Sequence, residues 1–143
     1  MVSSAQASGP APDLCNLTSL NPLHGRVFAI HASSFFHLFN EEKQLYVARA
    51  LAGLLSSESG SMIFGAHIAV PEGMGFEPST LHGYHRMWGH SPESWTELWD
   101  GLIFEKGTVK VQTKLVNWEK RNIPPDAPKD AMITILVWSV ARL

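Results

Sequence analysis

The spacing of hydrophobic and polar residues predicts four strands. Residues 26–31, Arg-Val-Phe-Ala-Ile-His, form a short and mostly apolar run, which is typical of a strand covered on both faces. Residues 61–70 form a second apolar run. Residues 108–118 alternate between apolar and polar side chains, which indicates a half-exposed strand. Residues 131–141 are apolar almost throughout, so we expect this strand in the middle of a sheet.

Two helices are predicted between these strands. The first covers residues 41–55, because Asn40 is a good N-cap and acidic side chains follow it at the positive end of the helix. Its apolar stripe repeats at spacings of three and four and consists of Leu45, Ala48, Leu51, Ala52 and Leu55. The second helix opens with Ser91 as N-cap and Pro92 at its first position. Its predicted buried face is Trp95, Leu98, Trp99 and Leu102.

The order of these elements indicates an α/β fold. Strands joined through helices favour parallel pairing with helices packed on the sheet, and the last two strands can close an antiparallel hairpin. Residues 1–12 carry almost no large apolar side chain and are expected to be a flexible lead-in to a domain over residues 13–143, which opens with a loop at 13–25. Residues 71–90 contain four glycines and two prolines, as a lid or a binding loop does.

Composition excludes several classes of function. The chain has 143 residues, a net charge of -2 and 17% charged residues, so it is neither a disordered tail nor a basic protein that tracks nucleic-acid phosphates. Its one cysteine excludes an internal disulfide and a thiolate-cluster metal site. Its start has no basic and apolar leader, and no apolar run approaches the roughly 20 residues that span a bilayer. We therefore expect a cytoplasmic chain with no membrane partner.

Several separated motifs carry a resemblance to a known family. They are Ile-His-Ala-Ser-Ser-Phe-Phe-His-Leu-Phe at 30–39, Glu-x-Gln-Leu at 42–45, Gly-Ser-Met-Ile-Phe-Gly at 60–65, His-Ser-Pro-Glu-Ser-Trp at 90–95 and Val-Trp-Ser at 137–139. Over residues 13–143 the chain resembles the C-terminal half of class I S-adenosyl-L-methionine-dependent methyltransferases of fungal secondary-metabolite, meroterpenoid-type pathways. The resemblance implies a partial Rossmann-like sheet whose four strands are strands 4, 5, 6 and 7 of the family, in the spatial order 4-5-7-6.

The same resemblance implies a cofactor and a reaction. The cofactor is S-adenosyl-L-methionine, whose methyl group passes to an oxygen or carbon of a small-molecule acceptor, a polyketide or terpenoid. The family's glycine-rich turn after strand 1, its acidic residue after strand 2 and its Gly-Asp motif after strand 3 are absent from this sequence. The loop after strand 4 lines the family's cofactor pocket, which assigns cofactor binding to His31, Ala32 and Ser33. From the residues alone, the same stretch with Ser34 favours a tight connection from strand to helix, and the resemblance gives cofactor binding equal weight with that interpretation.

Acceptor-contacting and catalytic residues have two interpretations each. Phe35 and Phe36 are either pocket wall or core. Tyr84 and Trp88 either cap an apolar acceptor or fold back onto the core. His37 is a general base for an acceptor hydroxyl or a histidine at a helix start, and a carboxylate acceptor needs no base at neutral pH.

Two further patterns favour ordinary loop structure. Histidines at 82, 85 and 90, with His67 on the preceding strand, could hold zinc, but they share no helix face, so we expect no metal. Gly-Met-Gly-Phe-Glu-Pro at 73–78 lacks the third glycine of a nucleotide-binding turn.

Without strand 1 of the family, the strand at 26–31 is an exposed apolar edge. Such edges recruit another strand, so we expect a homodimer or a complementary half-domain as partner. One rival function follows from this edge, a non-catalytic α/β half-domain that pairs with a partner subunit. A second rival is an unrelated small α+β enzyme with its pocket under residues 71–90.

Overall fold

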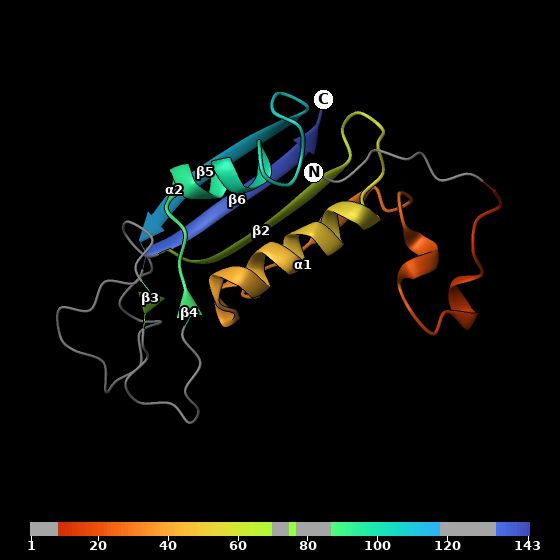
Figure 1. Cartoon of the computed structure of the whole chain (residues 1–143), viewed down its shortest axis with the longest axis horizontal. Helices are drawn as coiled ribbons and strands as arrows, with labels where there is room; N and C mark the ends of the chain where they lie inside the picture. The colour runs from red at the N-terminus through yellow and green to blue at the C-terminus, as the bar shows by residue number, and fades with distance from the viewer. Residues whose placement is uncertain (1–8, 70–74, 77–86, 118–133) are drawn as a thin grey trace.

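The main sheet of the protein has four strands. The computed structural model describes residues 9–69, 75–76, 87–117 and 134–143. The strands lie in the order β1 (Ala29–His31), β2 (Met62–Ala69), β6 (Thr134–Arg142) and β5 (Val109–Asn117). β1 runs parallel to β2, whereas β6 runs antiparallel to both of its neighbours (Figure 1). The last strand thus lies in the interior of the sheet and pairs with both β2 and β5, as its apolar sequence predicts.

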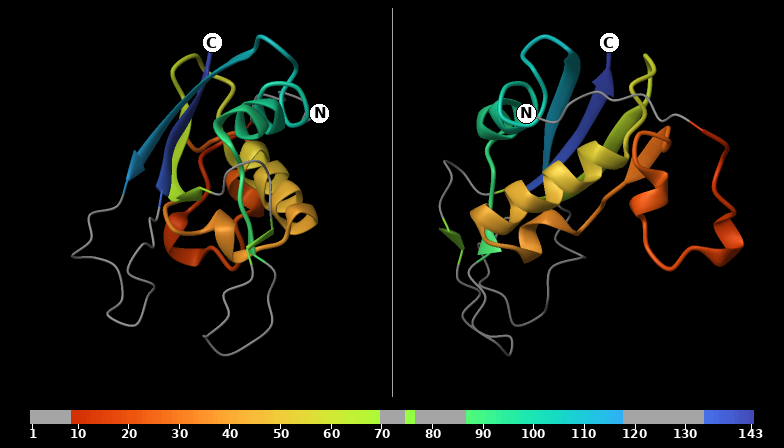
Figure 2. Two further views of the ribbon diagram at one scale, coloured as in Figure 1. Left: turned by 90° about the vertical axis from the view of Figure 1, so that its left-hand side faces the viewer. Right: turned by 45° about the vertical axis from the view of Figure 1, so that its right-hand side comes forward.

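Both α-helices of the described residues cover the same face of this sheet. α1 (Glu41–Leu54) joins β1 to β2, and α2 (Pro92–Trp99) packs over β5. Figure 2 shows the two helices together on one side of the strands. Side chains that β2 and β6 direct to the helices are buried, such as Ile63 and Val140, while those on the other face are partly or fully exposed.

Short elements complete the described structure. The 3-10 helices η1 (Leu14–Asn16) and η2 (Asn21–Leu23) lie within the segment expected to be loop, and η3 (Phe36–Leu38) follows β1. Two-residue strands β3 (Gly75–Phe76) and β4 (Met87–Trp88) pair antiparallel. The expected lid at 71–90 therefore holds a small ladder, while the lead-in at 1–12 stays a prediction because residues 1–8 lie outside the description.

The helix starts follow their capping chemistry. The Asn40 side chain accepts a hydrogen bond from the amide of Lys43 at 3.0 Å, so α1 begins where the sequence predicts. The Ser91 hydroxyl accepts from the amide of Ser94 at 3.2 Å, and the Ser94 hydroxyl closes a capping box with the Ser91 backbone. The stripe of α1 is confirmed, with Ala48, Ala52 and Leu55 buried and its two other leucines partly buried.

An aromatic cluster forms the core between the helices and the sheet. Its four rings each expose 3% or less of their surface, and they belong to Trp95 and Trp99 of α2, Trp138 of β6 and Phe36 of η3. Phe36 meets Trp95 edge to face with ring centroids 5.0 Å apart, and Trp95 lies 4.8 Å from Trp138. These contacts confirm the buried positions predicted for Trp95 and Trp99, and they tie η3 to α2 and the sheet.

Two buried histidines lie beside this cluster. The indole Nε1–H of Trp138 donates to Nδ1 of His67 at 2.9 Å, which leaves the proton of a neutral His67 ring on Nε2. Burial, with smaller contributions from His90 and His37, lowers the pKa of His67 to about 3. Burial also lowers the pKa of His90 to about 4, and Nδ1 of His90 lies 3.0 Å from the Ser94 hydroxyl. Both imidazoles are therefore neutral at pH 7.

The chain stays paired with β2 after β1 ends. The amide of Ala32 donates to the carbonyl of Phe64 at 2.9 Å, and the amide of Ser34 donates to the carbonyl of Ala66 at 2.7 Å. A methyl group on Gly65 would clash with the Ala32 carbonyl oxygen. Gly65 is thus the residue that lets the segment approach β2 so closely.

The first predicted strand is wrong in length and in environment. Only Ala29–His31 forms β1, and Ala29 and His31 are exposed instead of covered on both faces. Residues before Ala29 bond to the end of α1 as well as to β2, since the amide of Val27 donates to the carbonyl of Leu54 and the amide of Ser56 to the carbonyl of Val27. The helix end competes with the sheet for this backbone.

The predicted core position Leu102 is also wrong, and the far end of β5 is uncovered. Leu102 is 57% exposed, because α2 ends at Trp99 and the turn at Gly101, with φ +147°, brings Ile103 inward in its place. Leu115 is 49% exposed although it alternates in phase with the buried Val109. An eight-residue helix is only about 12 Å long, whereas a nine-residue strand spans about 30 Å, so α2 cannot cover the far end of β5.

Replacing Gly65 with alanine tests the close approach. The new methyl group meets backbone that cannot move aside, so we expect Gly65→Ala to lower the free energy of unfolding by about 3 kcal/mol. Gly53→Ala is the matched control, because the added methyl meets only the exposed His24 ring and alanine favours the helix. Urea denaturation followed by circular dichroism measures both variants, and equal stability of the two contradicts the assignment.

The buried histidines predict loss of stability in mild acid. Their pKa values are lower in the folded chain than the usual 6.5, so below pH 6.5 the unfolded chain takes up protons first and stability falls until the folded rings protonate near pH 4 and 3. Each histidine contributes a slope of up to about 1.4 kcal/mol per pH unit. Denaturation midpoints between pH 7.5 and 5 measure this slope.

The control for the pH effect is a pair of single substitutions. His67→Gln keeps an acceptor for the Trp138 indole and removes one titrating group, so the slope becomes shallower. His24→Gln, which changes a histidine outside the buried pair, is the matched substitution. A midpoint of the parent chain that stays constant from pH 6.5 to 5 is incompatible with neutral buried rings.

Candidate functional site

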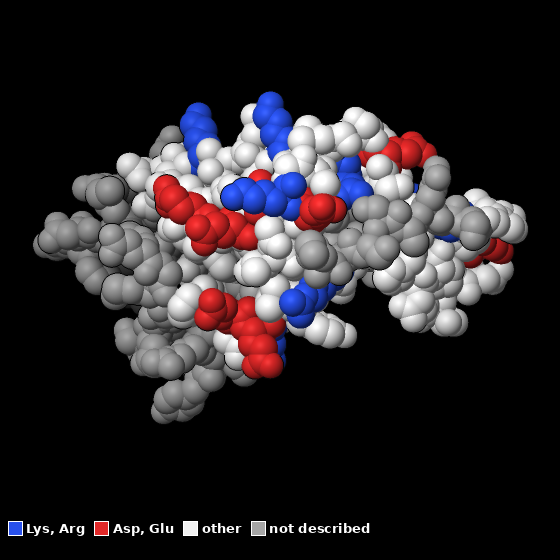
Figure 3. All heavy atoms as spheres, turned by 45° about the horizontal axis from the view of Figure 1, so that its top comes forward, with Lys and Arg blue, Asp and Glu red and all other residues white. Residues whose placement is uncertain are grey.

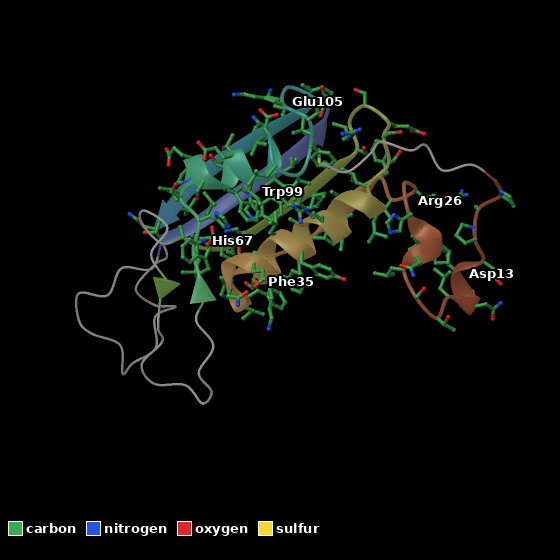
Figure 4. The ribbon with its side chains drawn as sticks, in the orientation of Figure 1. Asp13, Arg26, Phe35, His67, Trp99 and Glu105 are labelled. Carbon is green, nitrogen blue, oxygen red and sulfur yellow. The ribbon has the colours of Figure 1, made fainter. Side chains whose placement is uncertain are left out.

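The residues predicted to form the site gather at one end of the sheet. β1 and β2 are parallel, and their carboxyl ends lie at the end where η3, β3 and β4 are found (Figure 1). Phe35 and His67 lie towards this end in Figure 4, whereas Arg26 and Asp13 lie at the opposite end. In open α/β sheets, ligands bind at the carboxyl ends of parallel strands.

The Ser33 hydroxyl is already occupied within the protein. Its oxygen lies 2.7 Å from Nε2 of His31 and accepts a hydrogen bond from the amide of Ala66 at 3.2 Å. The hydroxyl therefore holds the segment after β1 against β2. This use of the hydroxyl fits the interpretation of the stretch as a tight connection from strand to helix. The backbone remains as the part of Ser33 that can reach a ligand.

The backbone of this segment alternates between two sides. Ala32 and Ser34 direct their amides to β2, so the intervening amide of Ser33 is directed to the opposite side of the extended chain. Among the described residues the Ser33 amide has no hydrogen-bond partner. A donor is thus presented at the outer side of the segment, at the carboxyl end of β1.

Ser34 ends the extended pairing. Its φ of 51° lies in the left-handed region, which costs a residue with a Cβ roughly 1–2 kcal/mol. The turn directs the chain into η3, where Phe36 enters the core. Backbone strain of this kind accompanies a segment whose position is fixed by its surroundings.

His31 and Phe64 form an exposed aromatic pair beside this segment. Their rings stack with centroids 5.1 Å apart and planes 28° from parallel. Both side chains lie on the face of the sheet away from the helices, where cross-strand neighbours share a face. His31 is therefore placed at the site, next to Ser33.

The phenylalanines after this segment differ in environment. Phe36 is completely buried among tryptophans, which favours packing over contact with an acceptor. Phe35 is partly exposed and meets Phe39 edge to face at 5.2 Å, so it can border a pocket. His37 is half-buried, and burial lowers its pKa, so its imidazole is neutral at pH 7 and can accept a proton.

Gln44 is a positioning residue that sequence reasoning missed. Its side chain is 1% exposed, and its Nε2 donates to the carbonyl of Phe39 at 3.0 Å and to the carbonyl of Trp88 at 2.7 Å. It thus joins α1, the end of η3 and β4, and fixes the half-buried Trp88 beside the site. A polar residue on the apolar side of a predicted helix was the available signal.

The remaining predicted residues lie outside this description. Tyr84, His82 and His85 fall in 77–86, so their roles stay predictions. In the described parts of the chain, no group of three metal-ligating side chains comes together. Within the same residues, every helix is too short or too polar to cross a membrane. Lys, Arg, Asp and Glu are interspersed on the face shown in Figure 3.

Comparison with known proteins identifies relatives for part of the chain. No protein-family model matches the sequence. It is 34% identical over 94 residues to the O-methyltransferase phiE of a fungal species (strain ATCC 74256), a stretch that covers 65% of this chain and 30% of phiE. It is 32% identical over 111 residues to the asnovolin E/chermesin D methyltransferase nvfJ of Aspergillus novofumigatus, covering 73% of this chain and 36% of nvfJ.

A third relative, the methyltransferase adrK of Penicillium roqueforti, is 29% identical over 99 residues, with 68% of this chain and 34% of adrK covered. The chain therefore spans about a third of the length of the relatives that it matches. Across about two-thirds of its own length, this protein resembles one part of the fungal secondary-metabolite methyltransferases.

Proposed function

We propose that the chain is part of an S-adenosyl-L-methionine-dependent methyltransferase that modifies a small polyketide or terpenoid in fungal secondary metabolism. The observation that carries this proposal is agreement between relatives and geometry. Several relatives are named methyltransferases, and the segment expected to meet the cofactor follows a parallel strand at its carboxyl end. The name of the nvfJ protein, a methyltransferase of asnovolin E and chermesin D, supports a small-molecule acceptor.

The four strands correspond in this proposal to strands 4, 5, 7 and 6 of a class I methyltransferase sheet. The observed order β1-β2-β6-β5, with one parallel pair followed by two antiparallel pairs, supports this correspondence. The cofactor would then lie at the carboxyl end of β1, on the side away from β2.

Within this site the Ser33 amide is the group that holds the cofactor. Its N–H is directed away from β2, and a backbone donor there suits the carboxylate of the methionine moiety. S-adenosyl-L-methionine supplies the reactive methyl group when bound, so the protein needs mainly to align the acceptor. His31, stacked on Phe64, borders the same position, and Ala32 lets the backbone lie close.

The acceptor side of the site is formed by Phe35 and Trp88. Phe35 presents a partly exposed aromatic ring, and Trp88 is held in place by Gln44. These rings favour an apolar ring system as acceptor. The neutral imidazole of His37 takes the proton of a hydroxyl acceptor, while a carboxylate acceptor needs none.

Photolabelling with radioactive S-adenosyl-L-methionine tests the proposal. Because the chain spans about a third of its relatives, we expect weak binding, so labelling is done at millimolar cofactor with and without excess S-adenosylhomocysteine. The label should appear on the peptide that contains residues 31–34 and disappear with the competitor. Labelling elsewhere, or equal labelling with the competitor present, contradicts the proposed function.

Two substitutions at Ser33 separate its amide from its hydroxyl. Ser33→Pro removes both, whereas Ser33→Ala removes only the hydroxyl, which is already bonded within the protein. Ser33→Pro loses the donor to the cofactor carboxylate, so its labelling should fall at least about tenfold below that of the parent chain. Ser33→Ala keeps the amide, so it should retain about half or more of the parent chain's labelling. Equal labelling of the two variants, with unchanged circular dichroism, would exclude the amide as the contact.

A further inference from the structure

Buried polar atoms without partners gather around η3. Among the described residues, five buried side-chain nitrogen or oxygen atoms lack a hydrogen-bond partner, and they belong to His37, Gln44, His67, Trp95 and Trp99. Three of these side chains place their rings against Phe36 of η3, with ring centroids 5.0 to 6.2 Å apart. His37 lies in η3 itself, and Gln44 bonds to the carbonyl of Phe39 directly after it. Such atoms are few in folded proteins, so their concentration at one place points to a ligand.

The two indoles have an explanation within the core. Trp95 and Trp99 meet edge to face with centroids 5.8 Å apart, and an N–H directed at an aromatic ring makes a weak hydrogen bond. A ring face cannot satisfy the carbonyl oxygen of Gln44, because that oxygen is an acceptor. Aromatic packing therefore does not explain the whole group.

The proton of His67 is held at its unpartnered nitrogen. The indole of Trp138 donates to Nδ1 of His67 at 2.9 Å, so the neutral ring carries its proton on Nε2. The His67 side chain is 2% exposed, and this Nε2 has no acceptor within the described parts of the chain. A buried donor without an acceptor costs about 1–3 kcal/mol. A ligand oxygen that accepts this N–H removes that cost.

The surroundings of His67 favour an uncharged ligand group. The rings of Phe36, Trp95 and Trp138 lie around it, with centroids 6.2, 4.6 and 6.0 Å from the imidazole. Burial is the main cause that lowers the pKa of His67 to about 3, and the same loss of water disfavours a carboxylate or phosphate beside it. A carbonyl or hydroxyl oxygen on an apolar skeleton fits these surroundings.

His67 lies at the end of the sheet that holds the candidate site (Figure 4). Only two residues of β2 follow it. Gln44, whose Nε2 donates to the carbonyl of Trp88 at 2.7 Å, has its unpartnered Oε1 on the same amide. A donor and an acceptor are thus available at the end of the sheet where Phe35 and Trp88 are assigned to the acceptor.

We propose that Nε2–H of His67 binds a neutral oxygen, a carbonyl or a hydroxyl, of the molecule that receives the methyl group. The proposal rests on the proposed function, because it takes the ligand to be the methyl acceptor. His67 is in this role a specificity residue that selects acceptors with an uncharged oxygen on an apolar ring system. Trp138 is a positioning residue, since its indole fixes the tautomer of His67.

Nuclear magnetic resonance of the 15N-labelled full chain at pH 7.5, without cofactor, tests this contact. The probes are trans-2-decalone, 2-decalol and decalin-2-carboxylate, which share a saturated bicyclic skeleton and differ in their oxygen group. We expect the ketone or the alcohol to move the His67 Nε2–H proton to lower field in a saturable way, and the carboxylate to bind at least about tenfold more weakly.

Two outcomes of this titration would overturn the inference. One is a carboxylate that binds as well as both neutral probes. The other is a Nε2–H proton at high field that no probe moves, because the ring current of Trp95 then shows that this N–H only packs against the indole.

Two substitutions at His67 separate its donor from its place in the core. His67→Leu removes the donor, whereas His67→Gln keeps an N–H donor and an acceptor for the Trp138 indole. We expect the dissociation constant of the better neutral probe, followed at the Trp95 indole, to rise at least about tenfold with leucine and to stay within about threefold with glutamine. Unchanged affinity of the leucine variant, with unchanged circular dichroism, contradicts the contact. If the leucine variant does not fold, loss of probe binding by the folded glutamine variant contradicts it.

The titration also separates this inference from the proposed function. A neutral probe that binds at His67 of a chain that the cofactor does not photolabel contradicts only the methyltransferase role. Photolabelling at residues 31–34 of a chain whose His67 responds to no probe contradicts only the contact proposed for His67.

Discussion

The close approach of the Ala32 carbonyl to Gly65 is the contact on which the rest of the site depends. It lets the segment after β1 run on beside β2, with amides of Ala32 and Ser34 bonded to that strand. It also directs the amide of Ser33 away from the sheet, and it starts the turn that carries Phe36 into the tryptophan cluster. A larger residue at position 65 would separate these features, because a backbone carbonyl cannot yield as a flexible side chain does.

Elements with local causes could be predicted from the sequence. Both α-helices begin at the polar caps that precede them, and the most apolar strand lies inside the sheet. Errors arose where an element ends earlier than its apolar pattern or where a second element competes for the same backbone. Val27 bonds to the end of α1, and Leu102 loses its buried position to Ile103 because the helix ends early. Periodicity predicts which side chains of an element are buried, but it does not predict where the neighbouring elements end.

The site was predicted by resemblance more than by residue chemistry. Motif similarity pointed to residues 31–33, but only the structure separates their groups, with the Ser33 hydroxyl bonded within the protein and its amide without a partner among the described residues. The Gln44 contact with Trp88 joins residues 44 positions apart, so the helix pattern could mark Gln44 as buried but could not name this partner. Gly65 carried a weak signal, since a glycine inside a strand often marks close backbone approach.

Hydrogen–deuterium exchange at single amides tests the central claim most directly. The account predicts that the amides of Ala32 and Ser34 exchange slowly in the free chain, while the amide of Ser33 between them exchanges fast and becomes protected only when S-adenosyl-L-methionine is added. Protection of Ser33 in the free chain, or fast exchange at all three amides with cofactor present, would contradict it.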